Sequence, residues 1–298
     1  MSAPAVAWIE GCWGTPGELA LPLNDRGLLL ADGLFETVLV LQGQPQLLEA
    51  HLQRWQRSAQ LLAMAPPPDA DALRPLITEA IERAELQQAS GALRLNWSRG
   101  SSSGRGIDQP TTPDNHRFWL QLTAHTPMFT AVTAIVSRHE RRNSSSRLSQ
   151  CKSFAYGQAI QARREAREAG ADDALLLSSE GSLCCGSAAN LLIRRHNRWL
   201  TPPLSSGCLP GVMRGRALEL GLAEEVELPR HAEPGDRWLL INSLGCRPLC
   251  RLDDLALEVH PGAEALWRSL LQADSVAALD GDATGETDGS LVGGQATR

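Results

Sequence analysis

Short strand-like segments dominate this chain of 298 residues, yet two helical segments follow one another in its first third with no strand between them. The first helix is predicted over residues 47–63, because apolar residues recur at helical spacing and three prolines follow. These apolar residues are Leu48, Leu52, Trp55, Ala59 and Leu62. The second helix is expected over residues 70–89. Helices in direct succession do not fit repeated strand-helix-strand units, so the pattern indicates an α+β fold.

The first part of the chain, residues 1–120, is expected to form a smaller α/β domain. Runs of branched and aromatic residues predict its strands at residues 5–8, 12–13, 34–41, 92–97 and 118–123. Residues 24–28 are expected to form a turn before the longest of these strands, and residues 99–106 a glycine-rich loop.

A larger, strand-rich domain is expected over residues 121–272. Short apolar runs predict its strands at residues 131–137, 174–177, 191–194, 199–200, 226–228 and 238–241. A polar loop is expected over residues 138–149, and helices between Lys152 and Gly170 and over residues 212–220. Residues 273–298 are low in apolar side chains, which predicts a flexible tail.

Charge and motif content argue against several classes of protein. The net charge is −6, from 28 basic and 34 acidic residues without a basic tract, which disfavours nucleic acid as a partner. No apolar run is long enough to cross a membrane, and the N-terminus lacks the features of a signal peptide, so a cytoplasmic location is expected. Seven cysteines without a CxxC or HExxH motif predict reduced thiols and no metal site.

Lys152 is the only lysine of the chain, since arginine occupies 27 of the 28 basic positions. Arginine is effectively always protonated, whereas a desolvated lysine can lose its proton and attack a carbonyl to form an imine. Lys152 is therefore the candidate catalytic residue, and the only tyrosine, Tyr156, follows four residues later. From composition alone, the alternative is a lysine left by chance in an arginine-rich chain.

A series of short motifs in a fixed order extends over most of the chain. They are DRG at residues 25–27, ADGLFE at 31–36, HLQR at 51–54, KSFAY at 152–156, EAGADDAL at 168–175, GSAAN at 186–190, TP at 201–202, LPGVMR at 209–214 and NS at 242–243. The set resembles the class IV aminotransferases, the fold type IV family of pyridoxal-phosphate enzymes. The resemblance implies an α+β fold with a smaller N-terminal α/β domain and a larger C-terminal strand-rich pseudo-barrel. It also implies pyridoxal 5'-phosphate as the cofactor, a small-molecule amine as the substrate, and a homodimer.

The resemblance implies a role for each residue of a cofactor site. Lys152 holds the aldehyde of the cofactor and later moves a proton, and Arg54 clamps the phosphate. The remaining predicted contacts are Leu209 against the ring, and Gly211, Val212, Met213, Asn242 and Ser243 around the phosphate.

The sequence departs from the family near the cofactor ring. Cys185 stands where the family has a glutamate against the ring nitrogen, and a neutral thiol cannot hold that nitrogen protonated as a carboxylate does. A small buried residue is the other interpretation of Cys185. Phe35 stands where D-amino acid transaminases have a tyrosine hydroxyl, and Leu39 where an arginine is common.

Arg99 and Arg105 match positions that recognise substrate carboxylates in the lyase and D-amino acid transaminase members. A solvated turn is the alternative for this glycine-rich loop. Phe35 and Tyr156 complete the expected substrate contacts.

Three functions are consistent with these features. The favoured one is a lyase that releases pyruvate and 4-aminobenzoate from 4-amino-4-deoxychorismate, in folate biosynthesis, because formation of an aromatic ring helps that step and it tolerates a weaker electron sink. The alternatives are a class IV amino-acid transaminase, of the branched-chain or D-amino acid type, and a non-catalytic pyridoxal-phosphate-binding protein.

Overall fold

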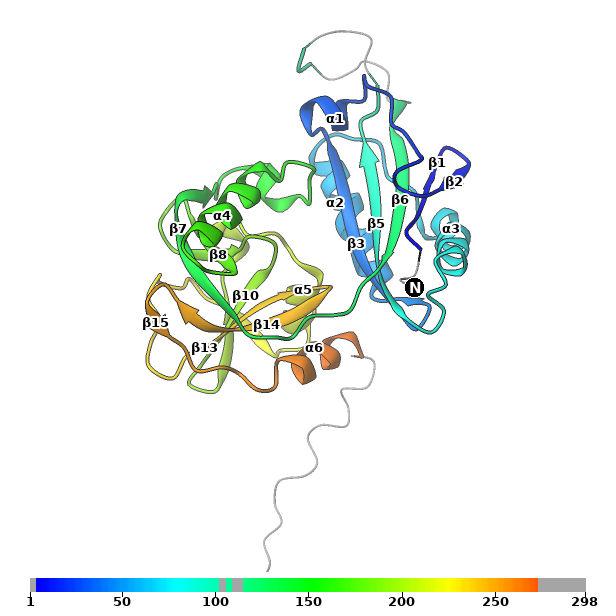
Figure 1. Ribbon diagram of the computed structural model, residues 1–298. Helices are drawn as coiled ribbons and strands as arrows, with labels where there is room; N and C mark the ends of the chain where they lie inside the picture. The colour runs from blue at the N-terminus through cyan, green and yellow to red at the C-terminus, as the bar shows by residue number, and fades with distance from the viewer. Residues whose placement is uncertain (1–3, 102–105, 109–114, 273–298) are drawn as a thin grey trace, which may run out of the picture.

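The structure, a computed structural model, describes residues 4–101, 106–108 and 115–272. Two sheets account for its strands, one formed before residue 125 and one after residue 131 (Figure 1). The tail expected at residues 273–298 lies outside the described residues. Within the described ranges, no helix is long and apolar enough to span a membrane.

The first sheet is antiparallel and has the strand order β2-β1-β6-β5-β3-β4. Its strands are β1 (Val6–Ile9), β2 (Cys12–Gly14), β3 (Gly33–Leu41), β4 (Gln44–Pro45), β5 (Ser90–Ser98) and β6 (Arg117–Ala124). Because β6 runs to Ala124, the domain boundary expected at residue 120 falls inside a strand. A short helix, α1 (Arg26–Leu30), replaces the turn expected at residues 24–28.

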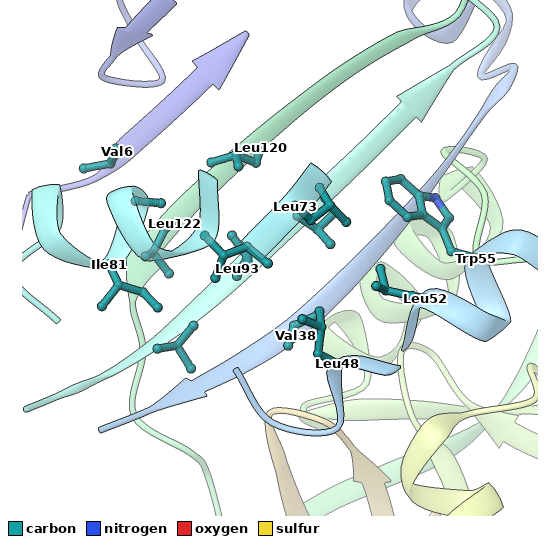
Figure 2. Packing of buried hydrophobic residues seen from close by; sticks show 14 of the residues in the cluster. Val6, Val38, Leu48, Leu52, Trp55, Leu73, Ile81, Leu93, Leu120 and Leu122 are labelled. Carbon is teal, nitrogen blue, oxygen red and sulfur yellow. The ribbon is translucent and has the colours of Figure 1, made fainter. Parts of the chain in front are cut away.

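Helices α2 (Leu48–Leu61) and α3 (Ala70–Arg83) pack their apolar sides on one face of this sheet (Figure 2). Trp55 of α2, Leu73 of α3 and Leu93 of β5 belong to this core, and all three are buried. Helix α3 ends at Arg83, earlier than the expected residue 89, because Glu85 takes a left-handed conformation that turns the chain toward β5.

The second sheet closes into a barrel. Its strands are β7 (Val132–Arg142), β8 (Asp173–Ser178), β9 (Leu183–Gly186), β10 (Asn190–Arg195), β11 (Arg198–Thr201), β12 (Ala223–Glu225), β13 (Arg237–Asn242), β14 (Gly245–Leu252) and β15 (Leu255–Ala256). Strand β9 pairs with β8 on one side and with β10 on the other, which joins β10, β13, β14, β7, β8 and β9 in a ring. This arrangement confirms the expected fold class, with its strand-rich pseudo-barrel.

Helices α4 (Gly157–Glu168), α5 (Val212–Glu219) and α6 (Ala263–Leu271) lie around the barrel (Figure 1). Neither α6 nor the strands β9, β14 and β15 are among the sequence predictions. The loop expected at residues 138–149 is partly strand, since β7 continues past a bulge to Arg142. The strand expected at residues 226–228 does not form; β12 precedes it and pairs with β11 only as far as Glu225 and Thr201, where β11 ends.

Candidate active site

A cavity of about 690 Å³ lies between strand β3 and the barrel, and Lys152 lines it. Its lining includes every residue that the sequence predicts for the cofactor, together with Phe35 and Tyr156 of the expected substrate contacts. The cofactor set is Arg54, Lys152, Cys185, Leu209, Gly211, Val212, Met213, Asn242 and Ser243. Residues that lie up to 208 positions apart in the sequence thus share one cavity.

Lys152 lies in a segment that precedes helix α4 but pairs with the first sheet. The Lys152 carbonyl accepts a hydrogen bond from the Phe35 N–H at 2.9 Å, and the Phe154 N–H donates to the Gly33 carbonyl at 3.0 Å. The Nζ atom lies 3.1 Å from the Tyr156 hydroxyl and 4.4 Å from the centre of the Phe35 ring. The amine therefore stands at the junction of the two sheets, inside the cavity.

A buried network orients Arg54. The spacing of His51 and Arg54 on α2 places both side chains toward Glu36 on β3. Arg54 Nε and Nη2 lie 2.8 and 2.5 Å from the two Glu36 carboxylate oxygens, and His51 Nδ1 lies 2.7 Å from Oε2. The other ring nitrogen of His51 lies 3.1 Å from the Ser243 hydroxyl. Glu36 thereby links two of the predicted phosphate contacts.

Burial and charged partners shift the pKa values of Glu36 and His51 in this network. Burial raises the pKa of Glu36, but the positive charge of Arg54 and the hydrogen bonds from His51 and Arg54 outweigh it and lower that pKa to about 2. Burial lowers the pKa of His51 despite the Glu36 carboxylate beside it. A neutral His51 donates from Nδ1 to Glu36, so its Nε2 accepts from the Ser243 hydroxyl.

The N-terminus of helix α5 faces the same cavity. Asn190 Nδ2 donates to the Leu209 carbonyl at 2.9 Å, and Arg54 Nη1 donates to the Pro210 carbonyl at 3.3 Å. A Cβ at Gly211 would lie 1.9 Å from Asn190 Oδ1, so only glycine allows this close approach. The first amides of α5 are thus held beside Arg54, an arrangement that suits a phosphate group.

Cys185 is a buried residue of β9 that lines the cavity. A hydrogen bond with Cys184, burial and the nearby Cys184 thiol raise its pKa well above the ordinary value, so it is a neutral thiol. Within the part of the chain that the structure describes, no aspartate or glutamate lines the cavity. All seven cysteines are free, as expected, and no set of three or more potential metal ligands occurs in the described residues.

Arg99 is not among the residues that line the cavity, so the structure does not support its predicted role in substrate binding. It is buried, and its Nε, Nη1 and Nη2 donate to Asp32 and to the carbonyls of Ala63 and Leu62, each at 2.9 Å. These bonds fix the loop to the first sheet. Arg105 lies outside the described residues.

Arg94 and Arg142 line the cavity although the sequence analysis does not single them out. The Arg94 guanidinium carbon lies 3.5 Å from the centre of the Phe35 ring, on the side of β5 opposite its buried leucines. Since Lys152 Nζ lies 4.4 Å from the same centre, the two cationic groups are less than about 8 Å apart. Side chains alternate between the two faces of a strand, and Leu93 and Leu95 of β5 are buried. This alternation could have predicted that Arg94 lies on the opposite face of the sheet, toward the cavity.

Comparisons with known proteins agree with this geometry. A bifunctional aminodeoxychorismate lyase/D-amino acid transaminase of Mycobacterium tuberculosis is 40% identical over 100 residues, a match that spans 33% of this chain and 34% of that protein. The aminodeoxychorismate lyase of Bacillus subtilis is 23% identical over 83% of this chain and 87% of its own length. The branched-chain amino acid aminotransferase of Escherichia coli has the same fold, with a TM-score of 0.79 at 18% identity, over 92% of this chain and 96% of that one.

The family model for class IV amino-transferases matches residues 33–252, from the first residue of β3 to the last of β14. That range contains Lys152, the network around Arg54 and the α5 N-terminus. The chain therefore belongs to the class IV aminotransferase family of pyridoxal-phosphate enzymes.

Proposed function

We propose that this chain is a pyridoxal-phosphate-dependent 4-amino-4-deoxychorismate lyase that releases pyruvate and 4-aminobenzoate. The observation that carries the proposal is a cavity lined by one amine and by the guanidinium groups of Arg54, Arg94 and Arg142, with no carboxylate among the described residues that line it. Relatives that bear the lyase name, from Mycobacterium tuberculosis and Bacillus subtilis, support it.

The cavity offers partners for the phosphate, the aldehyde and the ring face of pyridoxal phosphate. Arg54 and the α5 amides suit the phosphate, and Ser243 presents a hydroxyl beside them. Lys152 offers the amine for the aldehyde, and Leu209 supplies an apolar side chain for the ring. When bound, the cofactor supplies an electron sink for bonds made or broken next to the substrate amine.

The residues of this chain perform the remaining steps. Lys152 Nζ, hydrogen-bonded to the Tyr156 hydroxyl, is placed to take a proton from the substrate carbon that bears the amine. The Arg94 guanidinium, within about 8 Å of Lys152 Nζ, is placed to hold a substrate carboxylate. Arg142 is a second cation in the lining, and 4-amino-4-deoxychorismate carries two carboxylates.

The neutral Cys185 favours a lyase over a transaminase. A carboxylate next to the ring nitrogen of the cofactor strengthens the electron sink, and the described lining provides none. Loss of pyruvate from 4-amino-4-deoxychorismate produces an aromatic ring, which lowers the energy of the product and reduces the demand on the sink. Transfer of an amino group to a 2-oxo acid has no such assistance.

The test is to incubate the cofactor-loaded protein with enzymatically generated 4-amino-4-deoxychorismate and to measure pyruvate and 4-aminobenzoate together. We expect equal amounts of both from the wild type and neither from Lys152→Ala. If the loaded protein releases neither, the lyase assignment is wrong. Transfer of an amino group from one of a panel of L- and D-amino acids would then identify a transaminase. If no amine reacts, the chain is a binding protein.

We further propose a cytoplasmic homodimer. Three consecutive leucines of α1, Leu28, Leu29 and Leu30, are 56%, 63% and 45% exposed, and Leu23 and Ile107 are more than 80% exposed. An exposed apolar cluster of this kind is typical of a protein interface. Light scattering on the purified chain tests the oligomeric state, and a monomer at micromolar concentration would contradict it.

A further inference from the structure

The ring of Phe154 lies against two glycines at positions where no other residue would fit. A Cβ at Gly33 would lie 2.2 Å from Phe154 Cε2 and 2.6 Å from Cδ2. A Cβ at Gly27 would lie 2.9 Å from the same Cε2, and also 2.8 Å from Ser98 Cβ and 2.9 Å from Asp25 Oδ1. Neither glycine has a positive φ, so the backbone at both sites suits other residues and only the space requires glycine. We call Gly27 and Gly33 the glycine seat of Phe154.

The seat lies next to the reactive amine. Phe154 is two residues after Lys152, and Gly33 is two residues before Phe35, the ring that Lys152 Nζ approaches. Two backbone hydrogen bonds tie these segments together, from Phe35 N–H to the Lys152 carbonyl and from Phe154 N–H to the Gly33 carbonyl. They flank a single bridge between Leu34 and Ser153.

This short pairing needs a further contact to hold its register. An isolated bridge with two hydrogen bonds contributes little, because each bond adds only about 1 kcal/mol net. The Phe154 ring is also held laterally, with its centre 5.6 Å from the Trp119 ring and 6.3 Å from the Phe35 ring. The ring thus fixes where the Lys152 segment crosses β3.

We propose that Phe154 is a positioning residue, whose ring on the glycine seat holds the Lys152 amine at the point in the cavity where the carbonyl of the cofactor must lie. The inference rests on the proposed function only in taking Lys152 as the reactive amine. It adds that the first sheet helps to set the position of that amine, together with the Tyr156 hydroxyl at the start of helix α4.

The single lysine gives a direct readout of this position. Protein labelled with [ε-¹³C]lysine contains one labelled side chain, so its NMR spectrum reports Lys152 alone, with and without added pyridoxal phosphate. In Gly33→Ala the ring must move by about 1.2 Å to restore ordinary contact. We expect the Lys152 signal to shift or broaden and kcat/KM to fall about 100-fold, the effect of a displacement of this size.

A double variant separates positioning from general damage. Gly33→Ala with Phe154→Leu removes the ring atoms Cε2 and Cζ and leaves a smaller, flexible side chain against the added methyl group, so we expect the Lys152 signal and at least a tenth of the wild-type kcat/KM to return. The matched control is Gly91→Ala on the neighbouring strand β5, where a Cβ would lie 2.7 Å from Leu86 Cδ1 and where neither residue lines the cavity. It should lower stability and leave the Lys152 signal in place.

Three results would overturn the proposal. They are an unchanged Lys152 signal in folded Gly33→Ala, additive losses in the double variant, and an equal signal change in Gly91→Ala. If Gly33→Ala does not fold, Phe154→Ala removes the ring without a clash, and an unchanged signal there has the same meaning. If the wild type has no lyase activity but the Lys152 signal still changes in Gly33→Ala as expected, the proposed function is refuted and this inference stands.

Discussion

Glu36→Gln should lower the free energy of unfolding by about 3 kcal/mol at neutral pH. The Glu36 carboxyl group has a pKa of about 2 in place of its ordinary 4.5, because Arg54 and His51 outweigh the opposing effect of burial. Each pKa unit corresponds to about 1.4 kcal/mol, and glutamine imitates the protonated carboxyl group. Loss of one partner from a buried ion pair costs about 3–5 kcal/mol in general, which is consistent with this value.

The effect has a defined pH dependence. Because the pKa of Glu36 is lower in the folded state, its contribution is present above about pH 4.5 and is lost as the pH falls toward 2. The difference between wild type and variant should therefore shrink below pH 4.5. Urea unfolding followed by tryptophan fluorescence at pH 7.5, 5, 4 and 3.5 measures it, with eight tryptophans as reporters.

Glu79→Gln is the matched control, because Glu79 pairs with Arg83 in an exposed contact on α3. We expect it to change the free energy of unfolding by less than about 0.5 kcal/mol. A loss below about 1 kcal/mol in Glu36→Gln at pH 7.5, or a difference that stays constant as the pH falls, would refute the reasoning about the buried network.

Three further predictions concern the cavity. Arg94→Gln should raise the KM for a carboxylate substrate at least tenfold with little change in melting temperature. Arg99→Gln should leave KM unchanged and lower the free energy of unfolding by about 2–4 kcal/mol. Steady-state kinetics and thermal melts measure both effects, and a raised KM in Arg99→Gln with an unchanged KM in Arg94→Gln would contradict these roles. Arg54→Gln should weaken pyridoxal phosphate binding at least tenfold, and equal affinity in a cofactor titration would exclude Arg54 from the phosphate site. Iodoacetamide at pH 8 should label the exposed Cys12 well before Cys185, whose pKa is raised; peptide mapping checks the order, and rapid labelling of Cys185 would contradict a neutral thiol.

The sequence predicts the fold class through its resemblance to a known family, and every residue that this resemblance implies for the cofactor lines one cavity. Periodicity places helix α2 to within two residues, and short motifs fix which residues meet at the cavity. The strand β9 escapes prediction because its four residues, Leu183–Gly186, combine cysteines with a glycine and carry no alternation of polar and apolar residues. Its pairing with two neighbours, which closes the barrel, is a non-local property.

The arginines near the substrate show what a single sequence cannot supply. Arg94 lies in the middle of β5 and Arg99 follows its last residue, so both are plausible candidates for a carboxylate contact. The distinction depends on Asp32 and on the end of helix α2, which take all three donor groups of Arg99. Likewise, Glu36 and His51 are visible as motif residues, but their link to Ser243 depends on how α2 sits against the barrel.

The contacts that shape the cavity are also those that join the two sheets. His51 meets Ser243, Arg54 meets the Pro210 carbonyl, and Phe35 meets the backbone of Lys152. Because a cofactor bound there binds only the folded state in which the two sheets meet, it should raise the melting temperature of both sheets together. The two sheets should then melt in one cooperative event, and the colour of bound pyridoxal phosphate should fade in step with it. The absorbance of the bound cofactor would thus report the unfolding of both sheets.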